Sequence, residues 1–367
     1  MNQWSYGSVL LFVFFLCISI ATSAQSSKQN APSTLVDELQ LPFLTNGVTT
    51  TQDGRLFLNE IHLDGSAGPR VLEWRQGRAI PFPNQEWNET ASAINAASHL
   101  VLVNSLRIGP DGDLWLVDSG APGFGAAKIP HGPKLVDVEL HSNSVRRVYG
   151  LDSVTRTNSF VDDVRFNGRT AYLSDAGAGA LIVLDLDSGG ARRVLEGHPS
   201  VEATKPATGE GQVLYGPDGK PVFIQVDQLE VSGDGRWLFF QPASGPFSKI
   251  ETKWLKPDVP ESVIEQHVEH FADTPSTGGT AIDAAGNIYV SDVDRLRVLK
   301  VSRTGETSIV IEDPRLIWVD AMWIDNDGFL WMPAAQVNRL AIFHNGKSLV
   351  EFPAHVFKLY IGAQPVR

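Results

Sequence analysis

The sequence predicts an all-β protein, a six-bladed β-propeller of four-stranded blades with one short helix in a loop. One hairpin pattern, a polar residue followed by an apolar run, a turn and a second apolar run, occurs six times in the 367 residues. The first polar residue of each copy falls at Asn46, Asn104, Asp162, Asp227, Gly278 and Asp320. A lone hairpin cannot bury both of its faces, so β-rich repeats with glycine turns favour blades arranged around an axis.

The copies justify the blades in chain order. The first predicts strands near 55–61 and 70–74, and the second begins at Asn104 and continues through 114–117. The third copy is the most complete, because short apolar runs separated by turns supply the four strands that a blade requires. These runs lie at 162–166, 171–175, 180–185 and 191–195.

The segments between the hairpins vary in length. Residues 197–223 form an insertion with a hairpin of its own at 215–222. Residues 260–271 begin with proline and carry apolar side chains at helical spacing, which predicts the short loop helix. The sequence DNDG at 325–328 predicts a hairpin turn rather than an EF-hand loop, since the glutamate at the twelfth position of such a loop is missing. Either residues 35–41 or the C-terminal tail supplies the strand that closes the ring.

The N-terminus resembles an export signal. An apolar run at 9–20 precedes small residues, a pattern typical of a signal peptide at 1–24 and short for a membrane span. The alternative is an uncleaved anchor, because no Lys or Arg precedes the run. We read 25–38 as a disordered lead-in and expect the propeller at 39–367. Cys17 is the single cysteine, so the mature chain would hold none, which excludes disulfides and thiol catalysis.

Composition restricts the partners. The net charge is −12 and no basic run occurs, which argues against a nucleic-acid surface, because phosphate binding needs clustered Lys and Arg. We expect a secreted protein, extracellular or periplasmic, with no membrane contact after signal cleavage and a small molecule as its partner. Asn88 begins an Asn-Glu-Thr sequon, which in a eukaryotic protein would be a glycosylation site.

The segments between the repeats, together with the repeats, carry a family resemblance. The order VNSLRIGPDGDLWLVDSG, GPKLVDVEL, SFVDDVRF, AYLSDAGAGALIVLDLDSG, DQLEVSGDGRWLFFQPASG, WVDAMWIDNDGFLWM and HVFKLYIGA is similar to that of the major royal jelly protein and yellow family. This resemblance implies a secreted propeller. Yellow-type members are tied to pigment chemistry, including dopachrome conversion, and others bind small amines. More distantly, the hairpins resemble gluconolactonase and regucalcin propellers, in which a divalent metal at the axis serves the hydrolysis of sugar lactones.

The innermost strands of a propeller line a central channel, so the first residues of the repeats converge at one mouth. We therefore expect to find together Asn46, Asn104, Asp162, Asp227 and Asp320. Three carboxylates in one small volume repel each other unless a cation, protons or waters intervene. A divalent cation with oxygen ligands, Ca²⁺ above all, is the simplest compensation. The plainer alternative is that each acid caps backbone amides or holds water in the channel.

The gluconolactonase resemblance assigns roles by position. Asp162 and Asp227 stand at metal-binding positions. Asn46 stands where that family has a metal-binding glutamate, so the ligand set of this chain has one carboxylate fewer at that position. Asp227 would also be the catalytic general base. Asn104 stands at a substrate-contacting position, and we place Asp320 beside it as a second substrate-binding residue.

Two classes of function follow from this arrangement. As an enzyme, the protein would carry out metal-assisted lactone hydrolysis or a dopachrome-type isomerisation. As a binding protein, it would hold a small ligand without turnover.

Gly278 and Gly279 are expected to leave room for ligand. We read His267 and His270, three apart on the predicted helix, as a solvated face rather than half of a metal site, and Trp318 as a core residue.

Overall fold

The structure is a computed structural model that describes residues 1–4, 7 and 34–366. The predicted signal peptide at 1–24 lies mostly outside the described residues, and so does the lead-in up to residue 33. From Thr34 onward the chain forms one compact unit. Among the described residues, no helix is both long enough and apolar enough to cross a membrane.

The fold is a six-bladed β-propeller of four-stranded antiparallel sheets, as the sequence predicts. The strands of the first five blades pair in chain order, from the innermost strand outward. The strands of the first three blades, in this order, are β2 (Val48–Thr50), β3 (Leu56–Asn59), β4 (Val71–Arg75), β5 (Arg78–Pro81); β6 (Val103–Ile108), β7 (Leu114–Asp118), β8 (Lys134–Glu139), β9 (Ser144–Gly150); and β10 (Val161–Asn167), β11 (Thr170–Asp175), β12 (Ala180–Asp185), β13 (Ala191–Val194).

The last three blades continue the pattern, except that the final one takes a strand from the N-terminal side of the chain. Their strands are β16 (Val226–Val231), β17 (Trp237–Pro242), β18 (Phe247–Glu251), β19 (Glu269–Ala272); β20 (Thr280–Ile282), β21 (Ile288–Asp292), β22 (Arg297–Val301), β23 (Thr307–Glu312); and β24 (Trp323–Ile324), β25 (Phe329–Ala334), β26 (Ala354–Tyr360), β1 (Val36–Leu41). The connections hold short elements, which are β14 (Thr208–Gly209), β15 (Gln212–Val213), α1 (Glu261–Glu265), η1 (Glu86–Asn88), η2 (Asp152–Val154), η3 (Thr252–Leu255), η4 (Val337–Arg339) and η5 (Ala341–Phe343).

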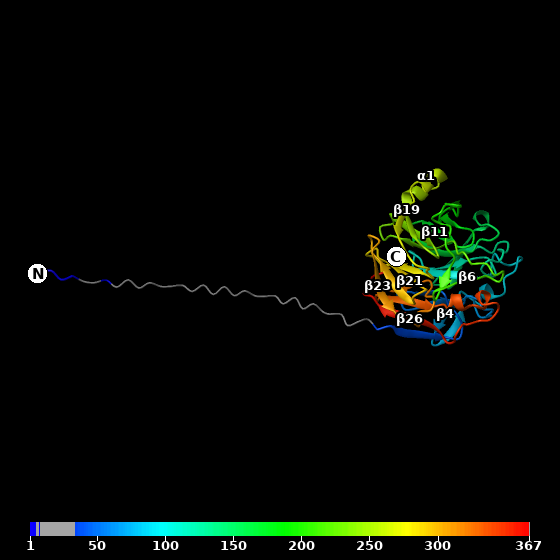
Figure 1. Ribbon diagram of the computed structural model, residues 1–367, viewed down its shortest axis with the longest axis horizontal. Helices are drawn as coiled ribbons and strands as arrows, with labels where there is room; N and C mark the ends of the chain where they lie inside the picture. The colour runs from blue at the N-terminus through cyan, green and yellow to red at the C-terminus, as the bar shows by residue number, and fades with distance from the viewer. Residues whose placement is uncertain (5–6, 8–33, 367) are drawn as a thin grey trace. The chain divides into compact units, whose positions relative to one another are not determined.

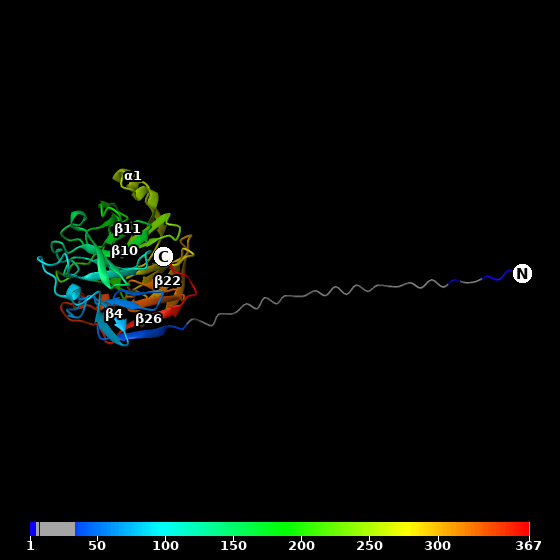
Figure 2. The same ribbon diagram turned by 180° about the vertical axis from the view of Figure 1, so that it is seen from behind.

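Both candidates for the closing strand are used. The tail forms β26, which pairs with β25 on one side and with β1 on the other. A parallel bridge between Gly47 and Ala321 joins blades one and six near the axis. Figures 1 and 2 show the result, with β4 and β26 side by side. Because β1 begins at Val36, the last residues of the predicted lead-in belong to the outer strand of blade six.

Aromatic residues in the second strand of the hairpins anchor the preceding turns. Trp331 Nε1 donates a hydrogen bond of 2.7 Å to Asp325 Oδ2, and Trp115 Nε1 donates one of 3.0 Å to Asp111 Oδ1. Gly328 completes the first of these turns with φ +84°, a conformation that glycine adopts without steric cost. The segment DNDG is therefore a hairpin turn, as expected, and its aspartate is held by an indole.

The core lies between neighbouring blades, where their apolar faces pack. Between blades three and four, for example, the buried cluster includes Tyr172, Leu181, Phe240 and Ile250. Each such side chain contributes about 1.5–3 kcal/mol by leaving water. Because every blade packs against two others, closing the ring buries the faces that a linear array would leave exposed at its ends.

The loop helix is present but shorter than the helical spacing predicts. Only Glu261–Glu265 is helical, and α1 lies at the outer edge of the ring (Figure 1). The following residues, Glu269–Ala272, pair with β18 as the fourth strand of blade four. Pairing with the edge of the sheet overrides the apolar spacing. A strand at this position satisfies backbone groups of β18 that a helix would leave exposed to solvent. His270 therefore lies on a strand and not on one helix with His267.

Candidate functional site

Irregular pairing at the start of three inner strands sets the direction of the predicted site residues. In β6 the register with β7 shifts on either side of Asn104. The same irregularity leaves Asp162 and Asp163 out of the ladder in β10, and Asp227 out of the ladder in β16. A β-bulge bends its strand and re-aims side chains, and bulges are common next to functional sites. The bulges thus release these polar side chains from the blade faces.

The strand beginnings meet at one cavity, which we call the central pocket. It has a volume of about 170 Å³. Its lining includes the first residue of every hairpin copy, namely Asn46, Asn104, Asp162, Asp227, Gly278 and Asp320. The structure therefore brings together all of the predicted site residues, while their roles in catalysis, substrate binding and metal binding stay predictions.

A chain of hydrogen bonds joins the amides of the pocket to Asp162. Asn59 Nδ2 donates to Asn46 Oδ1 at 2.5 Å, and Asn46 Nδ2 donates to Asn104 Oδ1 at 3.2 Å. Asn104 Nδ2 donates in turn to Asp162 Oδ1. Asn59 is fully buried, and its Nδ2 also donates to Val103 O at 2.8 Å, which fixes its orientation. Sequence reasoning missed Asn59, because it ends the second strand rather than opening the first.

The three carboxylates of the pocket are poorly solvated and share protons. Burial raises the pKa of Asp162 to about 6, although a hydrogen bond with Asp227 lowers it. Burial, and then the charge of Asp162, raises the pKa of Asp227 well above its usual range. The same two causes raise the pKa of Asp320. At neutral pH the cluster therefore carries fewer than three negative charges, and Asp227 is the proton donor to Asp162.

Trp318 holds Asp320 and covers Gly278. Its Nε1 donates to Asp320 Oδ2 at 3.1 Å, and the Ala321 amide donates to Asp320 Oδ1 at 2.9 Å. Trp318 has φ +49°, which is unusual for a bulky residue and marks local strain. A Cβ at Gly278 would lie 2.9 Å from Trp318 Nε1. The space expected beside this glycine is therefore filled by the indole, and Trp318 is a pocket residue as well as a buried one.

Apart from His62, the remaining wall of the central pocket is apolar and comes largely from loops. Its side chains are Ile61, Leu63, Phe124, Phe160, Ile224, Val337, Leu340, Ile342 and Phe343. The rings of Phe124 and Phe160 meet edge to face, with centroids 5.4 Å apart. Sequence reasoning missed this wall, because loop residues carry no periodicity that ties them to the channel. The pocket thus combines acids and amides on one side with aromatic and aliphatic groups on the other.

An ion pair ties together two of the loops over this side of the channel. Glu210, in the turn between β14 and β15, accepts from Arg339 Nη2 at 2.8 Å and from Arg339 Nε at 2.9 Å. Asn338 Nδ2 adds a third hydrogen bond of 2.8 Å. Arg339 and the adjacent amide lower the pKa of Glu210, although burial opposes them. This bidentate pair holds the segment 337–343, which supplies part of the apolar wall.

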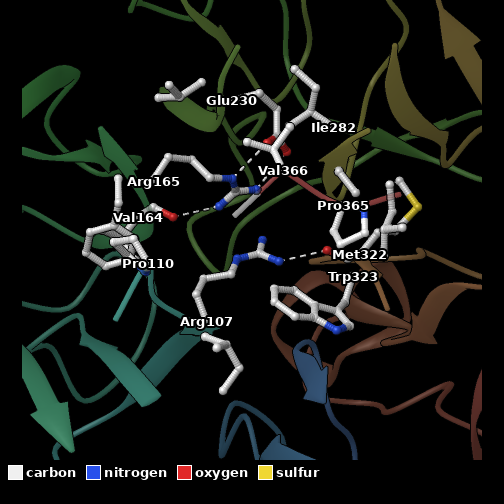
Figure 3. Close-up of a pocket in the computed structure, with 15 residues that line it drawn as sticks. Arg107, Pro110, Val164, Arg165, Glu230, Ile282, Met322, Trp323, Pro365 and Val366 are labelled. Carbon is white, nitrogen blue, oxygen red and sulfur yellow. Dashed lines mark hydrogen bonds and ion pairs between the residues drawn. The ribbon is translucent and has the colours of Figure 1, made fainter. Parts of the chain in front are cut away.

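The opposite end of the channel contains a buried charge network that sequence reasoning did not find, and Figure 3 shows its members Arg107, Arg165 and Glu230. Arg107 Nη2 and Arg165 Nη1 each donate to Asp163 Oδ2 at 2.7 Å. Arg165 also forms a two-point ion pair with Glu230 at 2.7 and 2.8 Å. Burial opposes ionisation, but Arg107 and Arg165 lower the pKa of Asp163. Two cations balance two anions here, and the network links blades two, three and four.

One surface expectation is contradicted. Asn88 is only 5% exposed, and its Nδ2 donates to Phe82 O at 3.0 Å and Asn84 O at 2.8 Å. Its Oδ1 accepts from the Val71 amide at 3.0 Å. A glycan on Nδ2 would remove these bonds and would have no exit to solvent. Asn88 is therefore a structural residue of blade one and not a glycosylation site.

Comparison with known families agrees with this architecture. The family model for major royal jelly protein matches residues 103–355, more than half of the chain. The chain belongs to the major royal jelly protein family. Its matched region spans blades two to five and the two inner strands of blade six, and it includes four of the five predicted site residues. No curated protein sequence matches the chain at a significant level.

Solved structures show the same propeller beyond this family. A gluconolactonase from Xanthomonas campestris has a TM-score of 0.55 and 13% identity, with 89% of each chain covered. A luciferin-regenerating enzyme has a TM-score of 0.53 and 12% identity over 91% of this chain and 99% of its own. The protein U3-55K has a TM-score of 0.52 and 12% identity over 89% and 98%. At these identities the likeness shows the fold alone.

Proposed function

We propose that this major royal jelly family protein is exported and binds a small organic cation in the central pocket. The single observation that supports the proposal is the composition of that pocket, with three carboxylates on one side and a largely aromatic and aliphatic wall, which also contains His62, on the other. A ligand that carries an ammonium group on an aromatic or aliphatic body matches both sides. Pockets of this kind, mostly apolar with a few convergent polar groups, are typical of small-molecule sites.

The protonation of the acids supports a cation over a neutral or anionic ligand. Asp162, Asp227 and Asp320 repel one another, and protons now relieve that repulsion. An ammonium group would take the place of a proton and would supply the same positive charge. Its three N–H groups would donate to carboxylate oxygens. The rings of Phe124 and Phe160 would add the attraction of their faces for a cation. An anion would meet only added repulsion.

The family setting is consistent with this ligand class. The resemblance to the major royal jelly protein and yellow family implies small-amine binding for some members. Export, expected from the residues at 1–24, would place the pocket in contact with extracellular solutes. The chain's net charge of −12 would also raise the local concentration of cations around it.

Calorimetry on the mature chain with three matched ligands tests the proposal. Phenethylamine, 2-phenylethanol and phenylacetate share one aromatic body but carry a cationic, a neutral and an anionic end. We expect the amine to bind and the acid not to bind. Asp320→Asn should weaken amine binding by about tenfold, the size of a lost charge-assisted contact. Asp258→Asn, which changes an exposed acid, should leave amine binding unchanged. Equal affinity for the amine and the alcohol would contradict the proposal.

A second candidate is metal-assisted lactone hydrolysis, which the Asp162–Asp227 pair favours. Asp162 and Asp227 offer oxygen donors of the type that a divalent cation takes, and Asn46 is the third predicted ligand. Asn46 Oδ1 is already used by Asn59, so the two carboxylates would carry most of the binding. A cation bound there would polarise the lactone carbonyl. The cation would displace the proton that Asp227 holds, so that the ionised carboxylate could take a proton from water. Asn104 and Asp320 would contact the substrate.

A lactone panel separates the two candidates. The mature chain, assayed with Ca²⁺ and after chelation, should hydrolyse a sugar lactone only with metal if the second candidate holds. Asp227→Asn should then abolish turnover while the fold, followed by circular dichroism, is retained. A dopachrome-type isomerisation would instead persist in chelator, because the proton-sharing carboxylate pair can move a proton without metal. Amine binding without any turnover would support only the first candidate, a binding protein for a small organic cation.

A further inference from the structure

A second cavity lies at the opposite end of the channel from the central pocket, and we call it the arginine cavity (Figure 3). Its volume is about 80 Å³, less than half that of the central pocket. Its lining includes Arg107, Arg165 and Glu230, whereas Asp163, the other acid of the charge network, does not line it. The side of the network that faces the cavity therefore carries two cations and one anion.

The two arginines are close neighbours in this wall. Arg107 Nη2 and Arg165 Nη1 both donate to Asp163 Oδ2 at 2.7 Å, so a single oxygen atom bridges the two guanidinium groups. Glu230 serves only one of them, because both of its oxygens accept from Arg165 and one also accepts from Thr280 Oγ1 at 2.8 Å. Among the described residues, the ion pair of Arg107 is with Asp163 alone. Arg107 is thus the cation with the least compensation in this network.

Arg107 also has hydrogen-bond donors without an acceptor. A guanidinium carries five N–H groups. Those of Arg107 make three hydrogen bonds within the described part of the chain, two to Asp163 at 3.2 and 2.7 Å and one to Met322 O at 2.7 Å. The side chain of Arg107 is only 6% exposed, so bulk water reaches little of it. Buried donors nearly always have a partner, and the remaining N–H groups, one on each terminal nitrogen, therefore need an acceptor in the cavity.

Apolar side chains form most of the remaining wall of the arginine cavity. They include Ile282, Met322 and Trp323. Trp323 directs its only polar side-chain atom away from the arginines, because Nε1 donates to Thr50 Oγ1 at 3.0 Å. Val366, near the C-terminus, forms a further part of the wall (Figure 3). A ligand that fills this space thus meets positive charge at one end and hydrocarbon at the other.

We propose that the arginine cavity binds a small carboxylate, with Arg107 as its main contact and Arg165 beside it. A planar carboxylate accepts hydrogen bonds from two guanidinium nitrogens at once, which a spherical halide does not match. The apolar wall covers a short carbon body such as that of acetate or propionate, and the small volume excludes larger acids. The site lies apart from the central pocket and holds whether or not that pocket binds an amine.

Calorimetry with two matched probes tests the proposal on the mature chain. Acetate and acetamide have nearly the same shape, but only acetate carries a charge. We expect one acetate to bind per chain and acetamide not to bind at the same concentration. Acetate affinity should be the same with phenethylamine in excess, because the amine is proposed to occupy the central pocket. This competition separates the two proposals.

A variant of the main contact gives the second part of the test. Arg107→Lys keeps the positive charge but loses the planar fork, so it should weaken acetate binding by about tenfold or more. Arg156→Lys is the matched control, since Arg156 pairs with Glu196 at the surface, and it should leave the affinity unchanged. Near-ultraviolet circular dichroism follows the folding of each variant. Val366→Phe, which fills the cavity from its tail wall, should abolish binding and serves if Arg107→Lys does not fold.

Four results would overturn the proposal. The first is a wild-type chain that binds no acetate or binds acetamide equally well. The second is a folded Arg107→Lys chain, or a folded Val366→Phe chain, with unchanged acetate affinity. The third is displacement of acetate by phenethylamine, because the acetate would then lie in the central pocket. The fourth is displacement by chloride at equal concentration, because the site would then recognise charge without the planar carboxylate.

Discussion

Replacing Asp162 by asparagine should make the protein more stable at neutral pH and should weaken the proposed amine binding. Burial raises the pKa of Asp162 from its usual 3.8 to about 6. The difference of about 2 corresponds to about 3 kcal/mol, since one pKa unit is worth about 1.4 kcal/mol. The folded protein therefore carries an ionised group that the unfolded chain accommodates more easily. Asparagine keeps the shape and can still accept the hydrogen bond from Asn104.

The pH dependence distinguishes this cause from ordinary repacking. A raised acid pKa contributes stability that is complete below pH 3.8 and is lost as the pH rises through about 6. The Asp162→Asn variant does not lose this stability as the pH rises, because asparagine does not ionise. The difference in free energy of unfolding between variant and wild type should therefore increase by about 3 kcal/mol between about pH 4 and about pH 8.

Urea denaturation of both chains across this pH range measures the effect. Asp258→Asn serves as the matched control, because Asp258 is an exposed acid and its loss should give a difference that does not change with pH. Phenethylamine binding, measured on the same samples, should weaken in Asp162→Asn. A variant that is less stable than wild type by the same amount at every pH would refute the reasoning, since the buried charge would then cost nothing.

Three further predictions follow from the same contacts. Affinity for a cationic ligand should rise by up to about tenfold per pH unit as the pH increases through about 6, because binding requires ionised Asp162, and calorimetry at several pH values measures the slope. Arg107→Met should reduce the free energy of unfolding by about 3–5 kcal/mol, because Asp163 would stay buried with only one of its two arginine partners. Loss of an exposed, singly paired arginine should cost under about 1 kcal/mol. Trp318→Phe should weaken amine binding by about tenfold, because the loss of the indole donor raises the pKa of Asp320 further, and an unchanged dissociation constant would contradict this.

The sequence by itself determined the architecture. Each hairpin combines an alternating apolar pattern with a glycine turn, and these signals are local, so they can be read along the chain without coordinates. The repetition of the pattern then fixes the number of blades. It also fixes which residues open the inner strands, and these are the residues that line the central pocket, Asn104 and Asp227 among them.

Only the tertiary structure decided what surrounds those residues. Arg107 and Asp163 are separated by a blade of sequence, and Glu210 meets Arg339 only because the ring closes. Such contacts depend on positions around the axis, which no local period encodes. The same holds for Asn88, whose sequon is visible in the sequence although its side chain is buried by residues that precede it.

The closing strand illustrates the physical reason. The alternation of β1 and of β26 is visible in the sequence, but each could pair with the exposed edge of β25. The choice depends on which arrangement leaves the fewest unpaired backbone groups once the ring is complete. That quantity belongs to the whole fold, so β26 took the inner place and β1 the outer one. Local pattern thus specified the blades, and ring closure specified their neighbours.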